Sequence, residues 1–243
     1  MKKNLKRLIL LIGIFSIVSS SVFARVILTK GQPDNYVDIN DHWAYDSIKY
    51  VIMQGYFQGI NNTEFSPDSE ITRAMLVTAL WRLTGDELTH VSYIDGVARV
   101  YPNYVKKFWD MKDSDWYTNY ISWANSNKII NGYAEREFRP NENLTREQLS
   151  VILYNYMKEY RVVRGFTQYI VNDAITFNDN DMISDWAKEK VSMMQQIGLM
   201  TGRPDGSFDP KGTVTRAEVA VVIERLVKML PGAWETIRDS PFC

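Results

Sequence analysis

Three arginines carry the clearest potential for chemistry in this sequence: Arg73, Arg146 and Arg216, each directly after a threonine. Threonine is typical of the position before a helix, so each arginine is expected in a first helical turn. A guanidinium presents a planar fork of donors that fits a carboxylate, and a helix start adds free amides and a partial positive charge. The three positions could therefore bind an anion. Alternatively, the arginines pair with three earlier aspartates or cap neighbouring helix ends. Those aspartates are Asp38, Asp110 and Asp179.

The arginines belong to an internal repeat. Three times, a tryptophan is followed by glycine 16, phenylalanine 22, proline 24 and arginine 30 residues later. The sets are Trp43, Gly59, Phe65, Pro67, Arg73; Trp116, Gly132, Phe138, Pro140, Arg146; and Trp186, Gly202, Phe208, Pro210, Arg216. A unit with constant internal spacing and connectors of varying length is typical of tandem structural repeats.

The first half of each repeat reads as an amphipathic helix followed by a turn-rich loop. After the tryptophan, apolar residues recur at helical spacing. Gly55 and Gly198 then fall where a helix C-cap belongs in the first and third repeats,. The second repeat has Lys128 at that place, so a different helix stop is expected there, at Asn127 or Asn131.

The second half of each repeat reads as another amphipathic helix, which begins at the threonine. A threonine followed three residues later by Glu or Gln forms a capping box, which satisfies two amides at a helix start. Residues 145–148 and 215–218 have this box, whereas residues 72–75 end on a methionine and lose it. Such a helix pair cannot bury both apolar faces alone, so the three pairs must share one core.

The connectors between the repeats, residues 89–107 and 164–176, are too apolar for free linkers. We expect them to pack on the shared core, with helices as one form that they can take. The three repeats would then behave as one cooperative unit.

The composition excludes several classes of function. The chain carries 28 Lys and Arg against 29 Asp and Glu, a balance that disfavours general nucleic-acid binding, which needs clustered cations. Its one cysteine, Cys243, permits no intrachain disulfide and no cysteine-based zinc site,. The two histidines, His42 and His90, form no metalloprotease motif, and serine-hydrolase and phosphate-loop motifs are missing,. We therefore expect no metal, no cofactor and no enzymatic activity.

Residues 1–24 read as a secretory signal peptide. Basic residues at positions 2–7 precede an apolar run that ends in small residues at Ala24, where cleavage is expected,. The run is shorter than the roughly 20 residues that cross a bilayer, and no later segment is uniformly apolar over that length. Cleavage would remove four positive side chains and leave a net charge of about −5.

The repeated motifs resemble the S-layer homology (SLH) domain, which has an aromatic-x-Asp start, a Trp-Ala pair, a G-x-x-x-G-rich loop with F-x-P and an I-T-R-A-E-like helix start. Here they read Tyr36-x-Asp38, Trp43-Ala44 and Ile71-Thr72-Arg73-Ala74-Met75; Phe108-x-Asp110, Trp116-Tyr117 and Leu144-Thr145-Arg146-Glu147-Gln148; and Phe177-x-Asp179, Trp186-Ala187 and Val214-Thr215-Arg216-Ala217-Glu218. We set the repeats at residues 36–88, 108–163 and 177–230, with a short tail at 231–243. The resemblance implies a mainly all-α fold, in which three helix-loop-helix repeats form a pseudo-threefold, three-pronged spindle around a central helical bundle.

The resemblance also implies a function and a place in the cell. It implies noncovalent anchoring to a bacterial cell wall or cell surface through secondary cell wall polysaccharide, which often carries a pyruvate ketal on an amino sugar. Some relatives of this kind instead bind polyamine-modified peptidoglycan. Lateral self-assembly in a surface layer, or recruitment of a protein partner, is a second class of function. A glycan hydrolase within the grooves between prongs is a third and weaker alternative.

Four residue types of each repeat are expected at the ligand. The arginines would bind the anionic ketal carboxylate, while the tryptophans would either fill the core or stack on a sugar face. The loop glycines would permit positive φ and close approach of their amides to the ligand. The aspartates are most simply helix-entry caps that support the site. These residues are Arg73, Arg146, Arg216, Trp43, Trp116, Trp186, Gly59, Gly132, Gly202, Asp38, Asp110 and Asp179.

The second repeat departs from the family pattern beside its arginine. Glu147 follows Arg146 directly and would compete there with an anionic ligand. We therefore expect Arg216→Ala to weaken wall binding more than Arg146→Ala does.

Overall fold

A computed structural model describes residues 31–84, 89–94, 97–133, 136–159 and 166–229. The expected signal peptide and the tail with Cys243 lie outside these residues. The described chain is mainly helical, with one two-stranded hairpin and several short 3-10 turns. Its α-helices are α1 (Tyr45–Met53), α2 (Arg73–Thr84), α3 (Thr118–Ser126), α4 (Arg146–Glu159), α5 (Asp185–Gln196) and α6 (Arg216–Met229). The 3-10 turns are η1 (Pro33–Asn35), η3 (Thr167–Tyr169) and η4 (Asn180–Met182).

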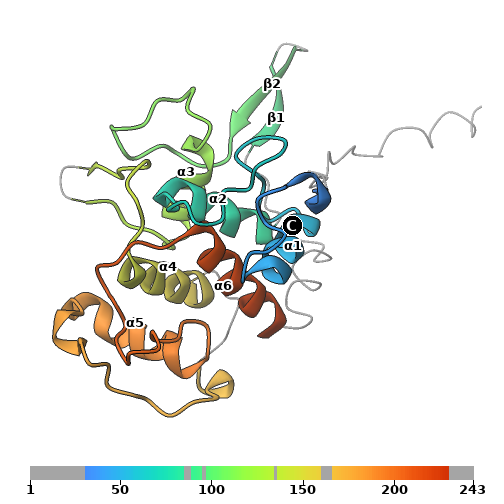
Figure 1. Cartoon of the computed structure of the whole chain (residues 1–243). Helices are drawn as coiled ribbons and strands as arrows, with labels where there is room; N and C mark the ends of the chain where they lie inside the picture. Colours follow the sequence, from blue (N-terminus) through green and yellow to red (C-terminus); the bar gives the residue numbers. More distant parts are fainter. Residues whose placement is uncertain (1–30, 85–88, 95–96, 134–135, 160–165, 230–243) are drawn as a thin grey trace, which may run out of the picture.

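The helices form a closed ring of three pairs. The second helix of each repeat packs on the first helix of the next repeat, so that α2 packs on α3 and α4 on α5. The ring closes between the two ends of the described chain, because α6 packs on α1. Figure 1 shows α2, α4 and α6 gathered at the centre. This is the pseudo-threefold arrangement that the repeats imply.

A ring of backbone hydrogen bonds ties the starts of the three central helices together. The amide of Ile71 donates to the carbonyl of Val214 at 2.9 Å, that of Val214 to Leu144 at 3.0 Å, and that of Leu144 to Ile71 at 3.0 Å. Each of these apolar residues is fully buried. A single residue from each repeat thus closes a cycle in which every repeat contacts the other two.

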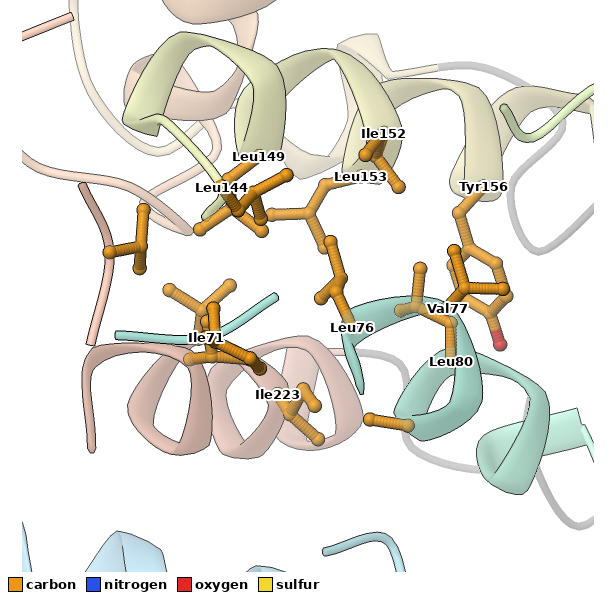
Figure 2. Close-up of a cluster of buried hydrophobic side chains, with 14 of the residues drawn as sticks. Ile71, Leu76, Val77, Leu80, Leu144, Leu149, Ile152, Leu153, Tyr156 and Ile223 are labelled. Atoms are coloured by element: carbon orange, nitrogen blue, oxygen red, sulfur yellow. The ribbon is translucent and has the colours of Figure 1, made fainter. Parts of the chain in front are cut away.

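The apolar faces of the central helices meet in one core, as Figure 2 shows. The second and later turns of α2 and α4 supply side chains with no solvent exposure, and α6 adds its own. Burying such a side chain stabilises the folded state by about 2 kcal/mol. The three repeats therefore depend on a shared interior. Its members include Leu76, Leu80, Leu149, Leu153 and Ile223.

The helix starts follow the sequence prediction. In α4 the amide of Thr145 donates to Gln148 Oε1 at 3.2 Å, and in α6 that of Thr215 donates to Glu218 Oε2 at 2.9 Å. The return bonds from the amides of residues 148 and 218 to the threonine hydroxyls complete both capping boxes. In α2 only the bond from the Met75 amide to the Thr72 hydroxyl forms. The predicted difference between the copies is confirmed.

The helix stop expected in the second repeat is found at Asn127, the C-cap of α3, but the premise that Lys128 cannot replace the glycine is wrong. Gly55 and Gly198 end α1 and α5 with positive φ, as predicted. Lys128 takes the same conformation, with φ of 59°, and the amide of Ile129 donates to the carbonyl of Ala124 as in the other copies. A shared turn geometry therefore outweighs the strain that a side chain suffers in the left-handed region.

The first connector forms strands, not helices. β1 (Thr89–Ile94) pairs antiparallel with β2 (Val97–Pro102), with Thr89 opposite Pro102 and Ile94 opposite Val97. Alternating β-branched and aromatic residues favour such a hairpin. The second connector packs on the bundle as expected: the ring of Phe166 stacks on Tyr154, with ring centroids 4.7 Å apart.

Candidate functional site

Each arginine inserts into the loop of the next repeat. Arg73 Nε donates to the carbonyl of Phe138 at 3.0 Å, Arg146 Nε to Phe208 at 2.7 Å and Arg216 Nε to Phe65 at 2.8 Å. A second nitrogen of each guanidinium reaches another carbonyl of the same loop. These second carbonyls belong to Asn131, Thr201 and Gln58. The arginines therefore clasp the ring of repeats, first to second, second to third and third to first.

The arginines are buried, and burial has an electrostatic cost. Their exposed fractions are 5% for Arg73, 7% for Arg146 and 4% for Arg216. Burial lowers the pKa of all three and brings that of Arg216 to about 10. Each guanidinium also lies over the ring of the phenylalanine whose carbonyl it binds, at 4.5 to 5.0 Å. The carbonyls and the ring offset part of the desolvation.

The helix starts offer no free amides beside these arginines, contrary to the sequence expectation. The amide of Ala74 donates to the carbonyl of Pro140, that of Glu147 to Pro210 and that of Ala217 to Pro67. The arginine amides bind carbonyls of the same neighbouring loops. The amides that a helix start usually leaves unpaired thus join the repeats instead of facing a ligand.

The early aspartates secure loops and do not cap helices. Asp38 accepts hydrogen bonds from the amides of Phe65 and Ser66, at 3.0 and 2.6 Å. Asp110 and Asp179 bind the equivalent amides of their own loops. The residue after each phenylalanine has a positive φ of 57–60°, which is unfavourable outside glycine. The carboxylates hold this turn in place, and the turn presents the carbonyl that the arginine binds.

The loop glycines are required by close packing and not by positive φ. They are not among the described glycines with positive φ, which are Gly55, Gly198 and Gly206. A Cβ at Gly59 would lie 2.2 Å from the Tyr36 ring, and one at Gly132 would lie 2.3 Å from the Phe108 ring. The amide of Gly59 donates to the Tyr36 hydroxyl at 3.0 Å, so it does not face a ligand. Gly202 packs in the same way against Phe177.

The repeat tryptophans lie on the surface. Their exposed fractions are 68% for Trp43, 57% for Trp116 and 52% for Trp186. The alternative that they fill the core is therefore wrong. An exposed indole is an apolar plate with one polar edge, which suits stacking on a sugar face.

A groove of about 460 Å³ brings the three repeats together. Trp43 of the first repeat, Arg146 of the second, and Gly202 and Arg203 of the third line it. Glu218 and Arg225 on α6 complete its charged lining, and leucine, valine and methionine side chains supply the apolar part. Three sequence-predicted residues thus meet in one place, although each comes from a different repeat.

Three charged residues of this groove, Arg203, Glu218 and Arg225, were not predicted as site residues. Glu218 Oε1 lies 3.5 Å from Arg146 Nη1 and 3.5 Å from Arg203 Nη1. Arg203 also binds Asp209 at 2.8 Å. The only signal for Arg203 and Glu218 was their place, directly after the loop glycine and in the capping box. Nothing in the local sequence showed that Glu218 would meet an arginine of the preceding repeat and Arg203 at the same time.

Glu147 does not compete at Arg146. Its carboxylate accepts hydrogen bonds from the Ser184 amide at 3.0 Å and from the Ser184 hydroxyl at 3.2 Å, and it pairs with Lys211. It therefore secures the start of α5, and the premise for ranking Arg146 below Arg216 is wrong. The carboxylate beside Arg146 is that of Glu218.

Comparison with known proteins agrees with the three sequence repeats. The family model of the S-layer homology domain matches residues 35–74, 107–150 and 176–220, which is more than half of the chain. Among the residues that the structure describes, no group of three or more His, Cys, Asp or Glu side chains could hold a metal ion. No helix in the described ranges is long and apolar enough to cross a membrane.

Curated relatives match over most of this chain but over little of their own length. The chain is 32% identical over 216 residues to the exoglucanase XynX of Acetivibrio thermocellus, covering 86% of this chain and 18% of the relative. It is 28% identical to the S-layer protein sap of Bacillus anthracis, covering 77% and 20%. It is 24% identical to the cellulosome-anchoring protein of Acetivibrio thermocellus, covering 78% and 38%.

Proposed function

The chain belongs to the S-layer homology family, whose domains are anchoring modules of secreted cell-surface proteins, and on that premise we propose a noncatalytic wall anchor. Its ligand is secondary cell wall polysaccharide, whose pyruvate ketals supply the negative charge. The repeats responsible are residues 36–88, 108–163 and 177–230. A signal peptide at residues 1–24 directs export and is cleaved from them. The enzymatic names of some relatives belong to proteins of which this chain spans a fifth or less.

One observation carries the proposal: an exposed tryptophan stands beside a groove that holds arginines. Trp43 is 68% exposed and lines the same groove as Arg146, Arg203 and Arg225. A flat apolar plate next to cationic donors suits a ligand with sugar faces and carboxylates. Carbohydrate sites need both, because a sugar ring has apolar C–H faces and polar edges.

Local charge explains how an acidic protein can bind an anionic polymer. The chain as a whole has a formal net charge of −1, so long-range attraction does not favour the ligand. In the groove, however, the side chain of Arg203 is 39% exposed, and Arg225 also lines the groove. Low-dielectric walls strengthen the attraction between such cations and a carboxylate.

The residues predicted for the ligand divide into two roles. The tryptophans, Trp43, Trp116 and Trp186, are the sugar platforms. The remaining nine hold the repeats and their loops together: the arginines bind loop carbonyls, the aspartates hold their turns, and the glycines admit the aromatic rings. A groove arginine with remaining donors, such as Arg146, can also contact the ligand.

The test is co-sedimentation of residues 25–243 with purified sacculi, before and after acid extraction of their secondary polysaccharide. We expect binding that is lost on extraction. Trp43→Ala is expected to weaken binding about tenfold, because a ligand ring that stacks on an aromatic side chain gains about 1–3 kcal/mol of binding free energy. Trp109→Ala is the matched control, since Trp109 is 64% exposed but does not line the groove.

Other outcomes point elsewhere. Binding that survives extraction indicates peptidoglycan as the ligand. Loss of sedimentation with both preparations, together with concentration-dependent assembly, indicates lateral self-association. Equal effects of the two tryptophan substitutions would separate wall binding from this groove.

A further inference from the structure

Two equivalent positions differ in chemistry among the three repeats. One lies two residues after the helix-start arginine, and the other lies directly after the loop glycine. In the third repeat they form an ionic pair, Glu218 with Arg203. In the second they form a neutral hydrogen bond, from Gln148 Nε2 to the Tyr133 hydroxyl at 3.0 Å. In the first they are the apolar residues Met75 and Ile60.

The ionic version places a carboxylate between two guanidinium groups. Glu218 Oε1 is 3.5 Å from one nitrogen of Arg146 and 3.5 Å from one of Arg203. Its other oxygen accepts the Thr215 amide at 2.9 Å and so caps α6. The side chain is 21% exposed and lines the groove. Its Oε2 is therefore held by the start of α6, while its Oε1 lies beside the two groove arginines.

We propose that Glu218 is an internal substitute for the ligand carboxylate and sets the selectivity of this groove between charged and neutral glycans. The inference rests on the proposed function. A ligand carboxylate that approaches Arg146 and Arg203 meets donors already shared with Glu218, and it is also repelled by that side chain. Only a carboxylate that replaces Glu218 at both guanidinium groups gains the full interaction. A neutral sugar, which needs no such replacement, is indifferent to the charge.

The chain itself supplies the substitution that tests this. In α4, Gln148 occupies the position of Glu218 and still accepts the Thr145 amide at 3.2 Å. Glu218→Gln is therefore expected to keep the capping box and the fold while it removes the charge. Glu189→Gln is the charge-matched control, because Glu189 lies on α5 with its side chain 68% exposed and does not line the groove.

The experiment titrates the whole secreted chain with two probes. One is a methyl glycoside of an amino sugar that carries a pyruvate ketal, and the other is the same glycoside without the ketal. The indole N–H signal of Trp43, assigned with Trp43→Phe, reports binding at this groove alone. We expect Glu218→Gln to bind the ketal probe about tenfold more tightly than the wild type, and the neutral probe with the same affinity. Glu189→Gln should change neither affinity.

Three results would overturn the inference. Weaker binding of the ketal probe by Glu218→Gln would mean that Glu218 holds the ligand instead of standing in for it. An equal gain for both probes would remove the role in selectivity. A Trp43 signal that does not respond to the ketal probe, in a protein that still sediments with sacculi, would place the anion elsewhere and leave the proposed function intact. A protein that neither sediments nor responds would refute the proposed function itself.

Discussion

At the scale of single residues, the arginines join the repeats before they serve any ligand. Each spends at least two donors on carbonyls of the neighbouring loop. Burial of the guanidinium costs free energy, as the lowered pKa of Arg216 shows. Such a group persists in the interior only because its donors are satisfied there. Loss of wall binding in an arginine variant is therefore ambiguous until its stability is known.

Arg216→Ala is expected to lower the free energy of unfolding by about 3 kcal/mol. The change leaves the carbonyls of Phe65 and Gln58 without their donors and opens a cavity over the Phe65 ring,. Urea denaturation followed by tryptophan fluorescence measures it. Arg203→Ala, at a half-exposed position, should cost less than about 1 kcal/mol. Equal losses in the two variants would contradict the clasping role.

The sequence correctly predicted that the three arginines lie in first helical turns, but it did not reveal their surroundings. Their place in a first helical turn follows from the threonine before them, which is a local signal. The roles assigned to the aspartates and glycines were wrong because their partners lie 20 to 30 residues away, as in the bonds from the amides of Gly59 and Phe65. Glu218 was missed because it meets Arg146 only across a repeat boundary, and Arg203 was missed because it joins this site through Glu218.

At the scale of elements, the helix starts were predictable, whereas the left-handed conformation of Lys128 after α3 was not. A capping box depends on only two residues three positions apart, so its presence in α4 and α6 could be predicted from the local sequence. The turn at Lys128 forms with positive φ although the residue is not glycine, and its local bonds, such as that from Ile129 to Ala124, match those of the other copies. The first connector was misjudged because a short apolar segment is ambiguous between helix and strand.

Lys128→Gly is expected to raise the free energy of unfolding by about 1 kcal/mol, since glycine removes the strain of φ 59°,. The midpoint of urea unfolding reports the gain. Asn127→Gly, one residue earlier with an ordinary φ of −88°, serves as the control and should stabilise nothing. A loss of stability on Lys128→Gly would show that the lysine side chain stabilises the fold by more than its backbone strain destabilises it.

At the scale of the whole molecule, ring closure makes three repeats one unit. A linear repeat array can open at one end while the rest stays folded. Here α1 contacts α6, and Ser47 donates to Glu224 at 2.5 Å across that junction. The first and last repeats are therefore neighbours in space, and neither can unfold without exposing the other.

Ile48→Ala, in the fully buried face of α1, should destabilise the whole ring by about 3 kcal/mol. Native-state hydrogen exchange measures the effect. We expect the slowest amides of α3, α4 and α5 to exchange faster by the same factor as those of α1, since only global unfolding exposes them. Acceleration confined to α1 would show that the ring opens locally.

Each of the three repeats contributes residues to the groove beside Trp43, and this limits how the repeats can be duplicated or lost in evolution. A gene that lost one repeat would encode a protein without this groove, because Trp43, Arg146 or the loop that contains Gly202 would be missing. A gene that gained a single repeat would leave that repeat without partners. Duplication and loss can preserve attachment of this kind only when they copy the three repeats together, so the inherited unit is the set and not its member.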